Sequence, residues 1–303
     1  MTQKRKWLYL GTIGTLFLLV AGWYLSAFLH APAPAPTSFD GSRALQDVET
    51  QVAFGPRIPD SDAHAKALAW MQSELVAAGW QVQIQSLTYM GHDIKNLIAT
   101  RSDEPPQIIL GAHYDSRLRA DRDPDPARRT EPVLGANDGA SGTAVLLEIA
   151  RTLPRDAVPV WLVFFDAEDN GRIPGWDWIL GSQAFVSNSS VTPKSMILVD
   201  MVGGTDLKIP MEGNSDQTLR DSIWSTAARL GHSDVFLPYV KYSVEDDHLP
   251  FIRAGIPAVD IIDLDYPYWH TTSDTPEHVS AHSLQVVGDV LETWLIQRRD
   301  ARQ

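Results

Sequence analysis

Several short apolar runs in this sequence are followed directly by a histidine or an acidic residue. Apolar runs of about 4 to 8 residues, bounded by loop-like sequence, are typical of buried strands. The polar residues at the ends of these runs, or in the turns between them, are His113, Asp115, Asp138, Glu168, Asp169, Asp200 and His270. An open α/β sheet carries its site along the carboxyl edge of its strands. The pattern therefore predicts an α/β sheet with a polar site at that edge.

Helix-like and strand-like segments alternate along the chain. We expect helices at 42–53, 63–78, 140–153, 218–230 and 283–297, and strands at 82–89, 96–100, 107–110, 158–165, 196–202 and 258–262. This order predicts a three-layer α/β sandwich, in which helices cover both faces of a mostly parallel central sheet. The polar segment 117–132 is too long for an ordinary connection, so we expect it to form the rim of the site.

Imidazole and carboxylate groups are the usual nitrogen and oxygen ligands of a catalytic zinc ion. The 303 residues include no cysteine, which excludes disulfides, thiolate ligands and a cysteine nucleophile. Glu168 and Asp169 are adjacent, and neighbouring side chains at a strand end point in different directions. One carboxylate can then bind a metal while the other transfers a proton. The residues predict a metalloenzyme.

The composition limits the partners of the chain. Its formal net charge is −13, and no basic stripe follows the first few residues, which argues against nucleic-acid binding. An acidic surface weakly favours cationic partners, such as the free amino terminus of a peptide. With 44% hydrophobic residues, the chain can bury a full core.

The amino-terminal part of the chain predicts a membrane anchor. A basic segment at 1–6 precedes an uncharged apolar stretch at 7–29, which is long enough to cross a hydrocarbon core of about 30 Å as a helix. Positive residues stay in the cytoplasm, so we expect an extracytoplasmic catalytic domain at 39–303, joined through a stiff Ala/Pro linker at 30–38. A signal peptide cleaved near Ala31 is the competing interpretation, although Leu29 is bulky where a small residue is preferred.

Four segments carry a family resemblance. They are Gly111–Ser116, Gly135–Gly142, Phe164–Asp169 and Trp269–Thr271. In this order, from about Gln51 to the carboxyl end, the chain resembles the M28 superfamily of zinc aminopeptidases, which also includes the animal-type glutaminyl cyclases. The resemblance implies a sheet flanked by helices, with the metal at the strand ends and peptide or protein amino termini as substrates.

The resemblance also assigns roles to matching positions. Asp138, Asp169 and His270 would bind the primary zinc, and Glu168 would be the general acid/base. His113 and Asp200 match residues that complete a second metal site in two-zinc aminopeptidases. We expect one zinc ion, and a second one is the alternative.

The choice between the two chemistries depends on smaller features. The segment Ser243–Phe251 resembles the cyclases, in which its second aspartate, here Asp247, joins a hydrogen-bond network near the general acid/base. Trp269 and Trp176 match tryptophans of the cyclase pocket, whereas Trp178 is expected to pack in the core or at the rim. These residues predict a cyclase that converts amino-terminal glutamine to pyroglutamate.

Other features favour an aminopeptidase. Asp169 stands where cyclases usually have glutamate, and the complete His113/Asp200 set would suit a two-metal site that activates water. A domain that only binds partners is a third possibility, but such a domain would lack a ligand or Glu168. All of these residues are present.

Overall fold

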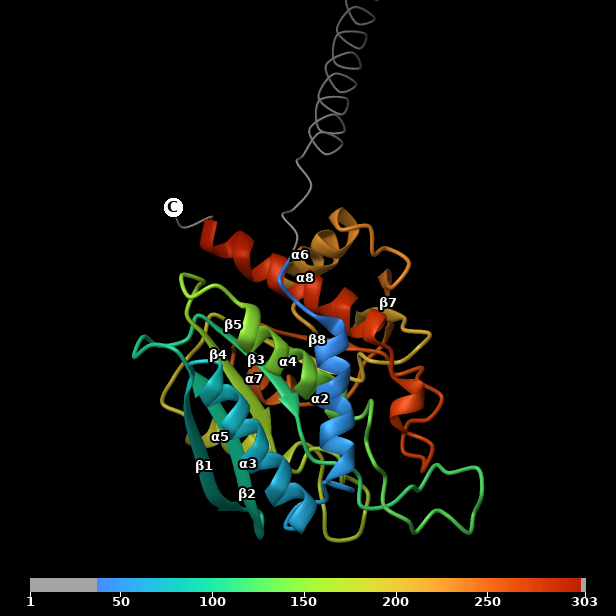
Figure 1. Cartoon of the computed structure of the whole chain (residues 1–303). Coiled ribbons are helices and arrows are strands. Elements are labelled where there is room, and N and C mark those ends of the chain that lie inside the picture. The colour runs from blue at the N-terminus through green and yellow to red at the C-terminus, as the bar shows by residue number, and fades with distance from the viewer. Residues whose placement is uncertain (1–36, 301–303) are drawn as a thin grey trace, which may run out of the picture. The chain divides into compact units, whose positions relative to one another are not determined.

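The computed structural model describes residues 37–300, so the predicted basic segment, the apolar span and most of the Ala/Pro linker lie outside the described residues. Residues 37–300 belong to one compact unit. Among them, no helix has both the length and the apolar character needed to span a membrane. The helices and strands are α2 (Gly41–Ala53), α3 (Asp62–Ala77), β1 (Gln81–Tyr89), β2 (His92–Thr100), β3 (Ile108–His113), α4 (Ala140–Thr152), β4 (Val160–Phe165), α5 (Leu180–Asn188), β5 (Ser195–Asp200), β6 (Ile209–Glu212), α6 (Gln217–Arg229), β7 (Phe236–Tyr242), α7 (Leu249–Arg253), β8 (Ala258–Ile262), the 3₁₀ turn η1 (Pro276–His278) and α8 (Ala281–Asp300) (Figure 1).

The central sheet has six strands in the order β1-β2-β4-β3-β5-β8. Strands β4, β3, β5 and β8 are parallel, while β2 pairs antiparallel with both β1 and β4. The sheet is therefore mixed, with a parallel part and an antiparallel β1–β2 hairpin at one edge. The hairpin turns at Met90 and Gly91, both with positive φ (51° and 91°), as a two-residue turn between twisted strands requires.

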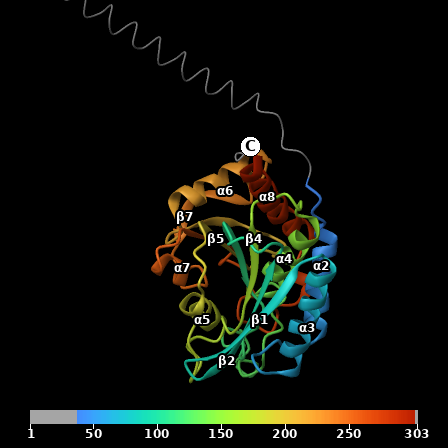
Figure 2. The same ribbon diagram turned by 90° about the vertical axis from the view of Figure 1, so that its left-hand side faces the viewer.

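Helices cover both faces of the sheet, as predicted. Side chains alternate between the faces, so Ile108 and Leu110 of β3 pack in the larger core with α2, α3, α4 and α8, whereas Ile109 packs in the smaller one with α5 and α7. Figure 2 shows these two groups of helices on opposite sides of the sheet. A separate two-stranded parallel sheet, β6-β7, was not predicted from the sequence.

Candidate metal centre and active site

The parallel strands deliver the predicted site residues to one edge of the sheet. His113 is the last residue of β3 and Asp200 the last residue of β5, and Glu168 and Asp169 follow β4. Because β3 pairs in parallel with both β4 and β5, these three carboxyl ends lie together.

Asp138 reaches the same place from the turn before α4. The carboxylate of Asp274 accepts hydrogen bonds from the backbone N–H groups of Asn137 (2.8 Å) and Asp138 (3.1 Å), which fixes this turn. The next residue, Gly139, has φ of 90°, and a Cβ there would lie 2.6 Å from the carbonyl oxygen of Asp115. Only glycine fits this position, so the turn depends on it.

Asp138, Asp169 and His270 form a buried group whose ligand atoms lie within 4.8 Å of one another. His270 Nε2 is 2.9 Å from Asp169 Oδ1 and 3.7 Å from Asp138 Oδ2. However, His270 Nε2, Asp138 Oδ2 and Asp169 Oδ2 have no hydrogen-bond partner among residues 37–300. Buried polar atoms that converge without hydrogen bonds are costly unless a cation compensates them. This donor set of two carboxylates and one imidazole fits zinc.

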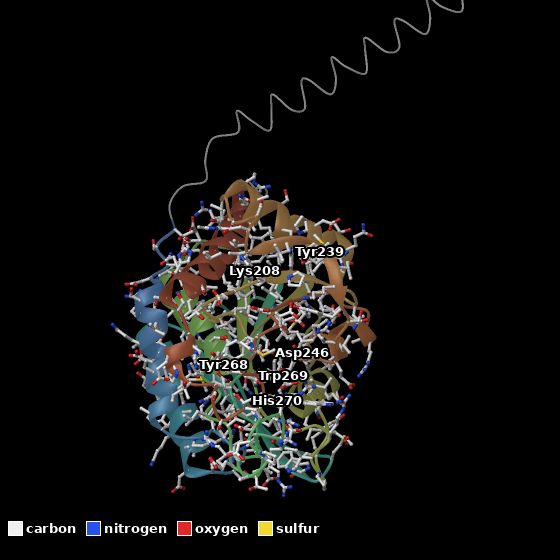
Figure 3. The ribbon with its side chains drawn as sticks, turned by 90° about the vertical axis from the view of Figure 1, so that its right-hand side faces the viewer. Lys208, Tyr239, Asp246, Tyr268, Trp269 and His270 are labelled. Atoms are coloured by element: carbon white, nitrogen blue, oxygen red, sulfur yellow. The ribbon has the colours of Figure 1, made fainter. Side chains whose placement is uncertain are left out.

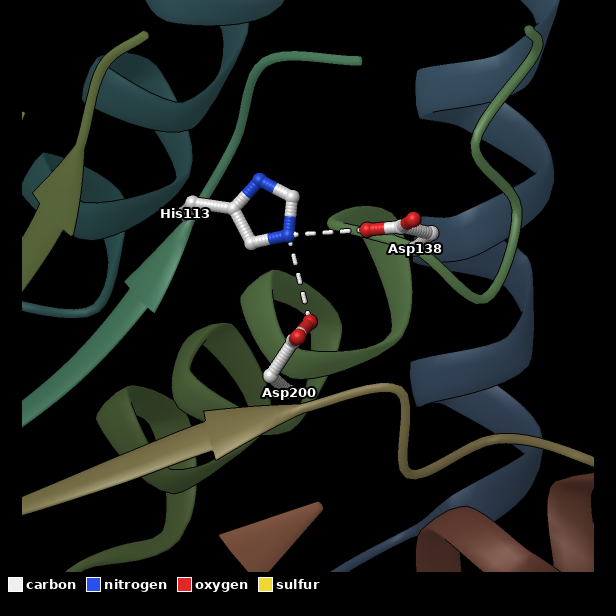
Figure 4. A group of neighbouring side chains, drawn as sticks. All are labelled: His113, Asp138 and Asp200. Carbon is white, nitrogen blue, oxygen red and sulfur yellow. Dashed lines mark hydrogen bonds and ion pairs between the residues drawn. The ribbon is translucent and has the colours of Figure 1, made fainter. Parts of the chain in front are cut away.

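A second group, His113, Asp138 and Asp200, shares Asp138 with the first. His113 Nε2 lies 3.1 Å from Asp138 Oδ1 and 3.1 Å from Asp200 Oδ1 (Figure 4). The other ring nitrogen, Nδ1, is 3.3 Å from Asp115 Oδ1. The residues predicted for a second metal, or for support of the site, are thus brought together.

The buried charges of the two groups alter their protonation. Burial alone would raise the pKa of Asp138, but the hydrogen bond and charge of His113, together with the charges of His270 and Arg117, hold that pKa below its usual value. At Asp169 burial dominates, helped by the charge of Asp138, and raises the pKa to about 6. These opposite shifts show how strongly the protonation of the site depends on the partners of each carboxylate.

Asp115 orients the two acidic residues after β4. Its Oδ1 accepts a hydrogen bond from the backbone N–H of Glu168 (3.0 Å), and its Oδ2 accepts one from that of Asp169 (3.3 Å). The preceding residue, Ala167, has a φ of 52°, a strained value that persists where surrounding contacts enforce it. Asp169 therefore reaches the metal group while Glu168 lines the adjacent cavity.

Glu168 is buried in acidic surroundings. Burial raises its pKa well above the usual value, and the charges of Asp246, Asp169 and Asp247 act in the same direction. A carboxyl group whose protonated form is stabilised in this way is suited to act as a general acid/base.

Asp246 and Asp247 differ in their position relative to the cavity. Asp246 lines the cavity together with Glu168, whereas Asp247, the residue assigned to the network from the sequence, does not line it. Asp247 is fully buried, and burial raises its pKa to about 7. Figure 3 labels Asp246 beside Trp269 and His270, which line the same cavity.

The cavity has a volume of about 900 Å³ and adjoins both metal-ligand groups. Trp269 lines it, as predicted, and its ring centroid is 4.1 Å from that of His270. The second tryptophan in the wall is Trp178, which the sequence assigned to core or rim packing. Trp176, the predicted pocket residue, does not line the cavity and instead stacks on His92 at 3.8 Å between ring centroids. Trp176 and Trp178 lie two positions apart in the same loop but have different neighbours, and the spacing in the sequence did not reveal which of them lines the cavity.

The long segment after β3 forms part of the rim, as predicted. Arg117, Asp121 and Arg122 from this segment line the cavity. Arg117 is buried. Its guanidinium group donates hydrogen bonds to Asp169 Oδ1 (3.3 Å) and to both carboxylate oxygens of Asp121 (2.7 and 2.9 Å). The sequence offered no specific signal for Arg117, because one arginine among several in a polar loop does not stand out.

A sheet edge with two overlapping His/Asp groups beside a buried glutamate defines a metal-dependent α/β enzyme. The sequence model of Peptidase family M28 matches residues 96–295. The chain therefore belongs to peptidase family M28.

Three proteins of known name are similar to this chain. A glutaminyl-peptide cyclotransferase-like protein from Bos taurus is 26% identical over 284 residues, which cover 80% of this chain and 72% of the relative. The crystal structure of Tannerella forsythia glutaminyl cyclase is 34% identical with a TM-score of 0.81, and the match covers 86% of this chain and 99% of that one. A leucine aminopeptidase precursor from Bacteroides thetaiotaomicron is 32% identical, also with a TM-score of 0.81, over 86% of this chain and 98% of that one. The chain is thus similar both to proteins named as cyclases and to one named as an aminopeptidase.

Proposed function

We propose that this protein is a zinc-dependent glutaminyl-peptide cyclotransferase, which converts amino-terminal glutamine to pyroglutamate and releases ammonia. The observation that carries the proposal is the cavity wall beside His270. Trp269 and Trp178 both line it, next to Glu168 and the Asp138, Asp169 and His270 group. Substrate choice depends on pocket shape, and two indoles next to the metal ligands suit a small side chain better than an extended one.

The chain supplies the remaining parts of the reaction. Zinc held by Asp138, Asp169 and His270 would polarise the side-chain carbonyl of the glutamine. The substrate amine forms a bond to that carbonyl carbon, and the bond from the carbon to the amide nitrogen breaks. Glu168 accepts a proton from the attacking amine and donates it to the departing nitrogen, which leaves as ammonia. Trp269 and Trp178 hold the bent glutamine in place, and intramolecular attack then benefits from a high effective molarity.

A zinc aminopeptidase is the second candidate. It is favoured by the complete group of His113, Asp138 and Asp200, whose ligand atoms lie within 4.8 Å of one another. Two metals sharing Asp138 would suit activation of water, with Glu168 as the base.

The two functions are separated by a parallel assay of the zinc-loaded full-length protein. We expect glutaminyl peptides to yield pyroglutamate and ammonia, and the zinc content to be nearer one than two per chain. Steady release of leucine or alanine from leucyl and alanyl peptides, with no pyroglutamate formed, would reject the cyclase and support the aminopeptidase.

A further inference from the structure

Two exposed arginines line the mouth of the active-site cavity. Arg122 comes from the segment after β3 and Arg172 from the segment after β4. The chain has a net charge of −13, and carboxylates line the deeper part of the cavity. Two arginines at its mouth therefore differ in charge from their surroundings.

The other charged groups at the mouth are paired. Asp121 is bound by Arg117 through both carboxylate oxygens, and Glu245 lies 3.5 Å from Arg253. Within residues 37–300, neither Arg122 nor Arg172 has a carboxylate partner within 4.0 Å. The mouth therefore carries two arginines that are not engaged in an ion pair within residues 37–300.

Arg122 is held in a defined position. Its guanidinium carbon lies 3.9 Å from the ring centroid of Trp269, and its backbone N–H donates to the carbonyl oxygen of His270 (3.2 Å). Stacking uses the flat face of the guanidinium group, while its N–H donors point outward in the plane. The donors of Arg122 thus remain available for an acceptor beside the wall of the pocket.

We propose that Arg122 and Arg172 bind a carboxylate of the substrate immediately beyond its amino-terminal residue. This inference rests on the proposed action at peptide amino termini. If the first residue lies against Trp269, the second one reaches the mouth, where Arg122 stacks on the same indole. Arginine is suited to carboxylates because its planar donors can bind both oxygens. The carboxylate is either the side chain of an acidic second residue or the free terminus of a dipeptide.

Matched peptides separate these two sources. Gln-Glu-amide is compared with the neutral Gln-Gln-amide, and Gln-Ala with a free carboxyl terminus is compared with Gln-Ala-amide. For the wild-type protein we expect kcat/KM to favour at least one charged peptide by about 3- to 10-fold, mainly through KM, and the preference to fall at high salt. A preference in the first pair assigns the side chain, and one in the second pair assigns the terminus.

Variants test the assignment to these arginines. In the double variant Arg122→Gln, Arg172→Gln the preference should fall to about 1-fold, while Arg122→Lys should retain part of it. Arg119→Gln, an exposed residue of the same segment that does not line the cavity, is the matched control and should keep the wild-type preference. The ratio between charged and neutral peptides is the readout, because loss of stacking on Trp269 would affect both peptides alike.

A binding measurement separates failure of this inference from failure of the proposed function. Calorimetry with zinc-loaded full-length Glu168→Gln gives the Kd of the same peptides without turnover. Equal Kd values for charged and neutral peptides, or a preference that persists in the arginine double variant, would overturn the carboxylate site. Absence of pyroglutamate from every glutaminyl peptide would instead reject the cyclase, and the same comparison on leucyl peptides would then decide the role of the arginines.

Discussion

The indole ring of Trp178 lies against the imidazole ring of His270, with the ring centroids 6.0 Å apart and the planes inclined by 20°. The guanidinium carbon of Arg117 is 5.0 Å from the same indole, and Arg117 also bonds Asp169. Trp178 therefore contacts one proposed metal ligand directly and a second one through Arg117.

Replacing Trp178 with alanine should raise KM by about 10-fold or more, because the substrate loses one wall of its pocket. Trp176→Ala is the matched control two residues away. It removes a stacking contact with His92 and should cost about 1 kcal/mol of stability, with kcat/KM nearly unchanged. Steady-state kinetics of both variants provide the measurement. An equal rise in KM for Trp176→Ala would support the predicted role of Trp176 in the substrate pocket.

Glu168 and His270 should respond differently to substitution. His270→Ala should lose zinc and activity together, because one of three donors is removed. Glu168→Gln should keep its zinc and lose about 100- to 10,000-fold in kcat, since only the proton carrier is lost. Metal analysis of the dialysed proteins, alongside the assay, tests this; loss of zinc from Glu168→Gln equal to that from His270→Ala would refute the assigned roles.

Substitution of Asp246 and of Asp247, one at a time, tests which of the two carboxyl groups takes part in the reaction. Asp246→Asn should lower kcat by about 10-fold or more with zinc content unchanged, because Asp246 lines the cavity together with Glu168. Asp247→Asn should have a smaller effect on kcat, because Asp247 is fully buried and does not line the cavity. The opposite order of effects would support the role that the sequence assigned to Asp247.

Glu212 should make stability depend on pH. Burial acts to raise its pKa, but the ion pair with His248 (3.3 Å) and hydrogen bonds from the backbone N–H groups of Asn214 and Ser215 outweigh burial and lower it to about 2 from 4.5. A lowered folded-state pKa stabilises the fold above pH 4.5, and that contribution is lost as the pH falls from 4.5 towards 2. Glu212→Gln should therefore cost about 2 to 3 kcal/mol at pH 7 and progressively less below pH 4.5.

Urea unfolding of wild type and Glu212→Gln between pH 3 and about 7 provides the test. Glu245→Gln is a suitable control, because Glu245 is exposed and forms an ion pair with Arg253 at 3.5 Å on the protein surface. A difference between wild type and Glu212→Gln that stays constant over this range would contradict the proposed linkage.

The amino-terminal segment supports a separate prediction. We expect the full-length protein to remain with the membrane after an alkaline wash, and added protease to reach the catalytic domain from outside the cytoplasmic membrane. Protection of the domain until that membrane is broken would contradict the predicted orientation. A mature amino terminus near Ala31 would instead support the cleaved signal peptide.

Local sequence patterns were sufficient for most of the sheet and for the polar residues at its edge. Buried strands are short and apolar, so β3, β4, β5 and β8 were all expected at nearly their observed places. The exposed strand β7 was missed, because it contains Pro238 and has no alternating pattern. Strand β2 starts earlier than predicted because its pairing with β1 extends to the turn, where Tyr89 faces His92.

The sequence by itself determined which residue types stand at the strand ends, and hence the family and a zinc-compatible donor set. The tertiary structure decided which neighbours in a loop face the cavity: Trp178 and not Trp176, Asp246 and not Asp247. It also decided that Arg122 stacks on Trp269, more than a hundred positions away in the chain. The direction of a side chain at a strand end follows from the regular alternation of side chains in a sheet. The direction of a loop side chain depends instead on backbone angles that are set by distant contacts.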